Sequence, residues 1–415
     1  MMKKPEVLLP AGNLETLKIA ILYGADAVYI GGDAYSLRAK ADNFSKEDLS
    51  KAIAFAHAHG KKVYITANIF AHNSDLEGIR SFFSELSLIR PDGVLVADPG
   101  VFLQANELLG DIPIHISTQA NNTNYESGRF WHRLGASRIV TARELSIAEI
   151  RMWKDHLPED LEIETFVHGA MCISYSGRCL LSNYFTGRDA NKGACTHPCR
   201  WRYVLMEETR DGEYLPIEES ERGTFIMNSK DLCMIEHIPE LVEAGVDSFK
   251  VEGRMKSVLY VATTARAYRQ AVDDYFEDPE KYKTRLSWYR KEVQACTNRT
   301  FTTGFFFGKP NEESMIYDES TYVTNYVFLG IVEGEASINN TVCYRMMQRN
   351  KFAVGNEVEV MRRDGQNITV TVLHLYDREG NMLDSVPHAK QMFYIDVGCE
   401  LFEYDIIRMK KEENG

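Results

Sequence analysis

VLLPAGNLETLKIAILYGADAVYIGG, residues 7–32, contains one complete strand–helix–strand unit. Two short apolar runs, Val7–Gly12 and Ala27–Gly32, are typical of buried β-strands. Between them, Leu14–Tyr23 has the apolar periodicity of an amphipathic helix. A strand, a helix and a strand in this order predict two parallel strands joined by a right-handed crossover.

The same unit recurs up to residue 254. The further strand-like runs are Val63–Asn68, Gly93–Asp98, Ile114–Gln119, Arg138–Arg143, Ile163–His168 and Ser248–Arg254. Helical patterns lie between them at Lys46–His59, Leu76–Ile89 and Ser146–His156, and Ser257–Phe276 follows the last run. Eight alternating strands predict an α/β fold, a (β/α)8 TIM-like barrel over residues 1–276. Thr224–Asp231 is a ninth candidate, so the pattern leaves open which of the last three runs closes the barrel.

Polar residues stand at the ends of these runs. In such barrels the active site is built where strands end and loops begin. The residues that would meet at one mouth are Asn68, Asp98, Gln119, Arg143, His168, Glu252 and Arg254. Glu252 and Arg254 share one face by strand alternation, with Lys250 beside them. These groups either bind an anionic substrate or form a salt-bridge network, and both readings stay open. Arg138 falls elsewhere on the same pattern, and we expect it to contribute little to such an anion site.

Cysteines cluster late in the barrel region. Five of the eight fall in one segment: Cys172, Cys179, Cys195, Cys199 and Cys233. Such clustering is typical of a soft metal or an iron–sulfur cluster. The paired Cys-x-x-Cys units of zinc ribbons are absent, although structural zinc remains an alternative. The segment interrupts the strand–helix alternation, which predicts a cysteine-bearing insertion at about residues 170–235.

The charge distribution restricts the partners. A net charge of −13 disfavours nonspecific nucleic-acid binding, which depends on clustered Lys and Arg. Residues 170–204 are an exception, because they carry five cationic residues against one carboxylate. This stretch is either a basic patch at the site or a solvated loop.

Neither a signal peptide nor a membrane span is predicted. The N-terminal residues lack the apolar stretch and cleavage site of an export signal, and no segment approaches the ~18 unbroken apolar residues of a span. We therefore expect a cytoplasmic protein that does not bind membranes, whose cysteines bind metal or do redox chemistry instead of forming disulfides.

One cysteine-containing motif resembles that of a known family. The matching residues are Glu164, Phe166, Gly169, Ala170, Met171, Cys172, Gly177, Cys179, Leu181 and Ser182. Similarity extends to Asn228–Cys233, Glu252–Lys256 and Thr303–Gly308. On these residues the chain resembles the collagenase-like peptidase family U32. It is most similar to the branch implicated in hydroxylating the wobble uridine of tRNA to 5-hydroxyuridine.

The resemblance implies a function and a cofactor. It implies an oxygen-independent tRNA hydroxylation, with prephenate as the oxygen source and a 4Fe-4S cluster. Its ligands by motif position are Cys172, Cys179, Cys195 and Cys233, with Cys199 as the competitor for the last place. The candidate catalytic residues are Glu164, His168 and Glu252, and the candidate substrate-binding residues are Arg143, Lys250, Arg254 and Lys256. The implied partners are tRNA and another protein of the family.

Two other activities remain open. The family's label suggests a peptidase, for which a cysteine nucleophile would need His168 or His197 as its base. The known protease motifs, such as Gly-x-Ser-x-Gly or His-Glu-x-x-His, are absent from the sequence. The other alternative is a cluster-dependent hydroxylation subunit that acts on a different substrate.

The C-terminal part has a different pattern. Residues 277–315 suggest a connector, and residues 316–415 contain short β-rich runs separated by turns such as Asp364-Gly365. This spacing predicts a small C-terminal β-barrel domain. The domain either braces the first one or holds a tRNA arm through its cationic residues, Arg362, Arg363, Lys390, Arg408, Lys410 and Lys411.

Overall fold

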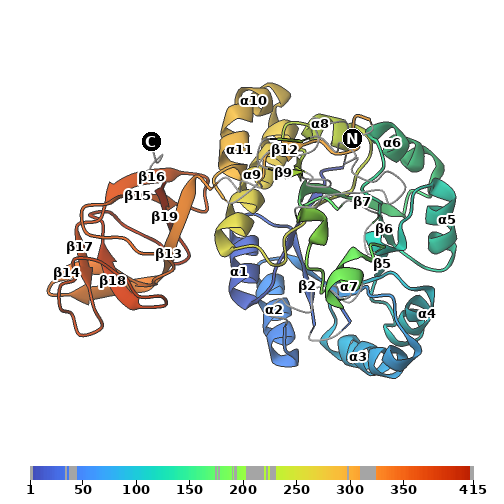
Figure 1. The fold of residues 1–415 in the computed structure, drawn as a ribbon, viewed down its shortest axis with the longest axis horizontal. Coiled ribbons are helices and arrows are strands. Elements are labelled where there is room, and N and C mark those ends of the chain that lie inside the picture. Colours follow the sequence, from blue (N-terminus) through green and yellow to red (C-terminus); the bar gives the residue numbers. More distant parts are fainter. Residues whose placement is uncertain are drawn as a thin grey trace, which may run out of the picture.

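The computed structural model has two parts, a ring of strands enclosed by helices and a smaller all-β domain beside it (Figure 1). It describes residues 3–32, 35–36, 44–172, 175, 178–188, 190, 194–201, 219–220, 223–224, 230–296, 299–308 and 324–411. None of the helices formed by these residues combines the length and apolar character needed to cross a bilayer.

Eight parallel strands form a closed barrel, which confirms the predicted fold. They are β1 (Glu6–Pro10), β2 (Ala27–Gly31), β3 (Lys62–Ala67), β4 (Gly93–Val96), β5 (Ile114–Ile116), β6 (Arg138–Val140), β7 (Glu162–Gly169) and β11 (Ser248–Val251). β11 pairs in parallel with both β1 and β7, so the Ser248 run closes the ring. Of the ninth candidate run, residue 224 belongs to the short hairpin of β8 (Glu219–Ser220) and β9 (Gly223–Thr224). Residues 225–229 lie outside the described part.

Helices surround the ring. They are α1 (Leu14–Leu22), α2 (Lys46–Ala58), α3 (Leu76–Ile89), α4 (Pro99–Leu108), α5 (Tyr125–Arg133), α6 (Ile147–His156), α8 (Ile238–Glu243) and α9 (Val258–Glu277). Several begin at a side-chain cap. Asn13 accepts a hydrogen bond from the Thr16 amide at the start of α1, and Ser257 accepts one from the Tyr260 amide at the start of α9. These caps satisfy backbone amides that the helix itself leaves without partners.

The chain between β7 and β11 contains added elements. They are α7 (Leu181–Thr186), the 3-10 turn Pro198–Arg200 and β10 (Asp231–Cys233). β10 runs antiparallel to the end of β7, with Cys233 opposite His168, and it pairs with β12 (Phe301–Thr302). This arrangement adds two short strands outside the ring, at the place where the sequence predicted an insertion.

The first half of the predicted connector belongs to the barrel domain. Residues 279–293 form α10 (Pro279–Thr284) and α11 (Leu286–Val293), which follow α9. Tyr282 and Tyr289 are buried in the core of the barrel domain, where their rings stack at a centroid distance of 5.7 Å. Residues 309–315 of the predicted connector lie outside the described part.

The C-terminal domain is a seven-stranded antiparallel sheet with its own apolar core. Its strands are β13 (Tyr326–Ile338), β14 (Thr341–Met347), β15 (Glu357–Met361), β16 (Asn367–Thr371), β17 (His374–Tyr376), β18 (Met392–Asp396) and β19 (Ile406–Lys410), in the order β16-β15-β19-β13-β14-β18-β17. Leu329, Phe352 and Phe393 are among the residues that fill its core.

A buried ion-pair network joins the two domains. The Glu292 carboxylate of α11 contacts Arg266 of α9 at 2.6 Å and Arg408 of β19 at 3.1 Å. All three residues are at most 3% exposed. The Tyr23 hydroxyl also donates to the carbonyl of Met361 across the interface. The idea that Arg408 helps to hold tRNA is therefore wrong, because its guanidinium is enclosed by the domain interface.

Candidate active site at the barrel mouth

A pocket opens at the carboxyl ends of the barrel strands. Its lining residues are Tyr29, Thr66, Asn68, Leu95, Ser117, Thr118, Gln119, Arg143, Phe166, Lys250, Glu252 and Arg254. Five of the seven strand-end residues singled out from the sequence are among them. The other two lie elsewhere. Asp98 accepts hydrogen bonds from the first amides of α4, and the His168 side chain lies on the outer side of the strands, against Tyr268 of α9.

Arg254 reaches across the pocket to the ends of β2 and β3. Its guanidinium donates to Thr66 Oγ1 at 3.1 Å and to Ser36 Oγ at 3.2 Å, and the residue is 6% exposed. The guanidinium lies against the backbone of Gly31, where an added Cβ would be 2.5 Å from Arg254 Nη2. Gly31 therefore has to lack a side chain for Arg254 to occupy this position.

Two more cations line the pocket against aromatic rings. The Arg143 guanidinium carbon is 4.1 Å from the centre of the Phe166 ring. Lys250 Nζ is 4.5 Å from the centre of the Tyr29 ring and 5.5 Å from that of Phe166. An aromatic face attracts a cation through its quadrupole. The rings thus help to hold two positive charges beside the third, Arg254.

Lys250 also belongs to a buried network inside the barrel. Its Nζ donates to Glu164 Oε1 at 2.6 Å, and Arg138 Nη1 donates to Glu164 Oε2 at 3.0 Å. Burial lowers the pKa of Lys250, and the Glu164 carboxylate opposes that shift. Lys250 therefore belongs both to the pocket and to a salt-bridge network. At this residue the two interpretations of the sequence, an anion-binding site and a salt-bridge network, are compatible.

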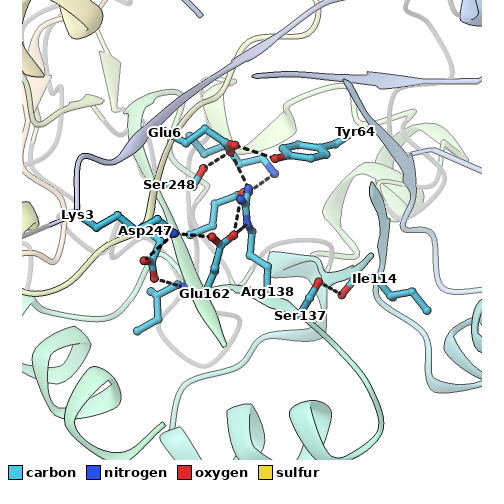
Figure 2. Close-up of polar contacts among 12 residues, drawn as sticks. Lys3, Glu6, Tyr64, Ile114, Ser137, Arg138, Glu162, Asp247 and Ser248 are labelled. Carbon is cyan, nitrogen blue, oxygen red and sulfur yellow. Dashed lines mark hydrogen bonds and ion pairs between the residues drawn. The ribbon is translucent and has the colours of Figure 1, made fainter. Parts of the chain in front are cut away.

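The network continues to the opposite end of the barrel. Arg138 contacts Glu6 at 2.7 Å and Glu162 at 2.6 Å, and Figure 2 shows it between these two carboxylates. Lys3 contacts Glu162 at 2.7 Å from the solvent side. Arg138, from which we expect little contribution to an anion site, is instead a central structural element, because its 3% exposed guanidinium pairs with three carboxylates.

The other candidate residues lie around the pocket instead of in it. His168 is buried against Tyr268 and Phe301, with ring centroids at 5.6 and 5.4 Å, and burial lowers its pKa to about 3. The pairing of β7 with β11 shifts register between Lys250 and Val251, so that His168 faces outward. Lys256 Nζ lies 5.2 Å from the centre of the Tyr260 ring and does not line the pocket.

Glu252 is the candidate carboxylate that lines the pocket. Its backbone amide donates to the carbonyl of His168 at 2.8 Å. Gly169 follows with a φ of 111°, and an added Cβ there would lie 2.6 Å from the Glu252 carbonyl oxygen. The turn at Gly169 thus permits the close approach of the two chain segments that places Glu252 at the rim.

The clustered cysteines lie in segments that adjoin the end of β7. Cys172 is exposed, whereas Cys179, Cys195, Cys199 and Cys233 are partly exposed, and none of the five forms a disulfide. Four such thiols match the donor chemistry of an iron–sulfur cluster. Their side chains do not converge, however: within the residues that the structure describes, no group of three or more His, Cys, Asp or Glu side chains could hold a metal ion.

Several pocket residues were not expected from the sequence. Tyr29, Thr66 and Phe166 lie within the predicted strands, not at their ends, and contribute an aromatic ring or a hydroxyl. Strand alternation was the available signal for Thr66, which precedes Asn68 by two residues and therefore shares its face. The aromatic partners of the cations had no comparable signal, because buried Tyr and Phe are ordinary core residues.

Comparison with protein families gives matches along most of the chain. Residues 12–316 match the model of peptidase family U32, and residues 324–408 match that of the family's C-terminal domain. Together the two matches include the barrel from α1 onward, the cysteine segment and most of the C-terminal sheet.

Two relatives are similar to the chain over nearly its full length, and a third over two thirds of it. The chain is 42% identical to tRNA hydroxylation protein P1 of Bacillus subtilis, over 99% of this chain and 96% of the relative. It is 36% identical to tRNA hydroxylation protein P of Escherichia coli, over 96% and 95%. It is also 37% identical to the 23S rRNA 5-hydroxycytidine C2501 synthase of E. coli, over 66% of this chain and 40% of that protein.

Proposed function

The chain belongs to peptidase family U32, and from that premise we propose that it is a tRNA-modifying enzyme that hydroxylates the wobble uridine to 5-hydroxyuridine. The observation that carries the proposal is the near full-length similarity to two tRNA hydroxylation proteins. The similarity to an rRNA hydroxycytidine synthase adds support for hydroxylation of a pyrimidine base as the reaction class. Such a protein would work in the cytoplasm, together with tRNA and a second family member.

The barrel pocket is our candidate site for the oxygen donor. Arg143, Lys250 and Arg254 supply three positive charges, whereas Glu252 is the one carboxylate among the lining residues. A dicarboxylate of the prephenate type matches this charge pattern, because guanidinium groups bind carboxylates through paired hydrogen bonds. The small hydroxyl groups of Ser117 and Thr118 could orient such a donor by further hydrogen bonds.

The cysteine segment is our candidate site for a 4Fe-4S cluster. Cys172, Cys179, Cys195 and Cys233 would hold it, with Cys199 as the alternative to Cys233. When bound, a cluster of this kind supplies electron transfer. What supports the proposal is the chemistry of the four thiols and the position of two of them at the end of β7, where Cys172 follows the strand and Cys233 lies opposite His168.

The described contacts suggest different roles for the three candidate catalytic residues. Glu252 lines the pocket and is the group that could touch a substrate there. Glu164 contacts Lys250 and Arg138 inside the barrel, so we assign it the role of holding Lys250 in position and stabilising its positive charge. His168 supports the rim through its carbonyl, which accepts the Glu252 amide, and through its buried ring.

The contacts do not favour peptidase chemistry at the proposed cysteine–histidine pairs. His168 is 2% exposed and packed behind the barrel wall, opposite Cys233 on the paired strands. Burial raises the pKa of the Cys233 thiol to about 12, and a protonated thiol is a poor nucleophile. The backbone amide of His197 donates to Cys195 Sγ at 3.4 Å, a contact that does not involve the imidazole that would have to act as base.

Mass spectrometry of tRNA nucleosides tests the proposal. A strain that lacks this protein, and any paralogue of the same family, should lose 5-hydroxyuridine and the nucleosides derived from it. Expression of the wild-type chain should restore them, and the Arg254→Lys variant should restore them poorly. Unchanged 5-hydroxyuridine in the deleted strain would refute the proposed function.

A further inference from the structure

Exposed aromatic side chains collect on the segment that follows β7. Tyr184 is 82% exposed, Phe185 46% and Trp201 41%. The ring centroids of Tyr184 and Phe185 are 5.2 Å apart, and those of Phe185 and Trp201 are 6.0 Å apart. We call these three residues the aromatic platform. Exposure of large aromatic rings to water is unfavourable, so a group of them on the surface is a candidate contact site.

Hydrogen bonds hold the platform together. The platform residues come from α7 and from the chain around the Pro198–Arg200 turn. The Thr196 amide donates to Ser182 Oγ at 3.0 Å, and the hydroxyls of Thr186 and Thr196 are hydrogen-bonded at 3.3 Å. Because Ser182 is buried, these bonds fix α7 against the stretch that carries Trp201.

The platform adjoins the barrel mouth. Arg178, just before α7, places its guanidinium carbon 4.1 Å from the centre of the Phe70 ring. Phe70 follows β3 and lies two residues beyond the pocket residue Asn68. Arg178, just ahead of the platform, therefore lies beside the end of β3, at the end of the barrel that holds the pocket.

The surroundings of the platform are cationic. Arg178 and Arg188 are both exposed, one on each side of α7. The whole chain has a net charge of −13, yet residues 170–204 contain five cationic residues and one carboxylate. The positive charge of this stretch would attract a polyanion and repel a basic partner.

We propose that the aromatic platform binds the unpaired bases of an RNA loop by stacking, while Arg178 and Arg188 supply charge for its phosphates. Aromatic rings interleaved with arginines are the combination that binds single-stranded nucleic acid. An apolar protein partner would gain nothing from the arginines. The inference rests on the proposed tRNA substrate and deepens it, because it assigns the surface that holds the loop whose base enters the mouth.

Binding of a fluorescently labelled anticodon stem-loop to the full chain tests this inference. Tyr184→Leu keeps an apolar side chain but removes the ring, so we expect it to weaken binding about tenfold. Tyr184→Trp keeps the ring and should bind like the wild type. Phe130→Ala is the matched control, since Phe130 is 54% exposed on α5 and lies outside the platform. Thermal melting followed by circular dichroism checks that each variant is folded.

Tryptophan fluorescence gives a second measurement. The chain has four tryptophans, of which Trp131 and Trp153 are buried, and Trp201 is part of the platform. Stacking of a base on Trp201 should quench the emission when the stem-loop is added, and Trp201→Phe should abolish that quench while keeping most of the affinity. A blunt-ended RNA duplex of the same stem sequence, which has no unpaired bases, should bind more weakly and cause no such quench.

The outcomes separate this inference from the proposed function. Equal binding of the stem-loop by the wild type and Tyr184→Leu would overturn the platform, as would equal binding and quenching by the blunt-ended duplex. A change in self-association alone, seen by sedimentation, would show a protein contact instead and also overturn it. Loss of 5-hydroxyuridine in the deleted strain would still support the function in those cases. Platform-dependent RNA binding without that loss would retain the inference and refute the function.

Discussion

Arg138 and Lys250 bind opposite oxygens of one carboxylate, that of Glu164. The distances are 3.0 Å for Arg138 and 2.6 Å for Lys250, and all three residues are at most 3% exposed. The pair spans the barrel interior, because Arg138 continues to Glu6 and Glu162 at one end and Lys250 lines the pocket at the other. The position of the Lys250 charge at the mouth therefore depends on the ion pairs inside the barrel.

We expect Glu164→Gln to destabilise the fold strongly. It leaves the buried Lys250 charge without its partner, and such a loss costs about 3–5 kcal/mol. Urea denaturation should show the change, with Asp111→Asn as a control, since the Arg90–Asp111 pair is exposed to solvent and contributes little to stability. Adding Lys250→Met to Glu164→Gln should recover part of the loss. Full stability of Glu164→Gln alone would show that the network does not stabilise the barrel.

Arg254→Lys should keep the fold and lower hydroxylation by about tenfold or more. Losing a charged, paired hydrogen bond costs roughly 1.5 to 3 kcal/mol. The yield of 5-hydroxyuridine, iron content and thermal melting should be measured together. Arg151→Lys is a suitable control, because Arg151 is exposed and only loosely paired with Glu243 at 3.7 Å. If Arg254→Lys retains full hydroxylation, Arg254 is a structural tie to Thr66 and not a substrate anchor.

Iron analysis tests the cysteine assignment. Protein prepared without oxygen should contain about four irons, and the quadruple change of Cys172, Cys179, Cys195 and Cys233 to Ala should remove them. Cys343→Ala, in the core of the C-terminal domain, should retain all of the iron. Single changes of Cys199 and Cys233 then identify the fourth ligand, since only the true ligand loses iron. Iron that persists in the quadruple variant would reject the assignment.

Acid should remove the contribution of Glu162 to the stability of the fold. Burial alone would raise its pKa, but Arg138 and Lys3 lower the pKa of Glu162 from 4.5 to about 2. A carboxyl whose folded pKa is depressed stabilises the fold above its unfolded pKa, and this stability is lost as the pH falls through the folded value. The difference in unfolding free energy between the wild type and Glu162→Gln should therefore shrink between about pH 4.5 and pH 2. The exposed Glu77→Gln change serves as the control, and a constant difference for Glu162→Gln would contradict the ion-pair account.

The barrel could be read from the sequence because local signals agree. Strand runs end at glycine or polar residues, and capping residues such as Asn13 and Ser257 stand where the helices begin. Closure could not be read, since the Ser248 and Thr224 runs have similar β-character and only their pairing with β1 distinguishes them. Pairing between strands so distant in sequence depends on the whole fold.

The pocket was predicted in part for a related reason. Strand alternation brings Arg143, Glu252 and Arg254 to the mouth as expected. The same rule failed for His168, because the register shift opposite Lys250 and Val251 turns its ring outward. The role of Arg138 was missed because a cation at a strand start is commonly exposed, whereas this one finds three carboxylates inside the ring.

The Glu292 network makes the two domains a single cooperative unit. Ile331, Met361 and Ile406 of the C-terminal sheet belong to the same continuous apolar core as the barrel residues. A chain cut ahead of β13 would expose that core and leave Arg266 and Glu292 without Arg408. Calorimetry should accordingly record one melting transition for the whole protein, and the barrel expressed alone should aggregate.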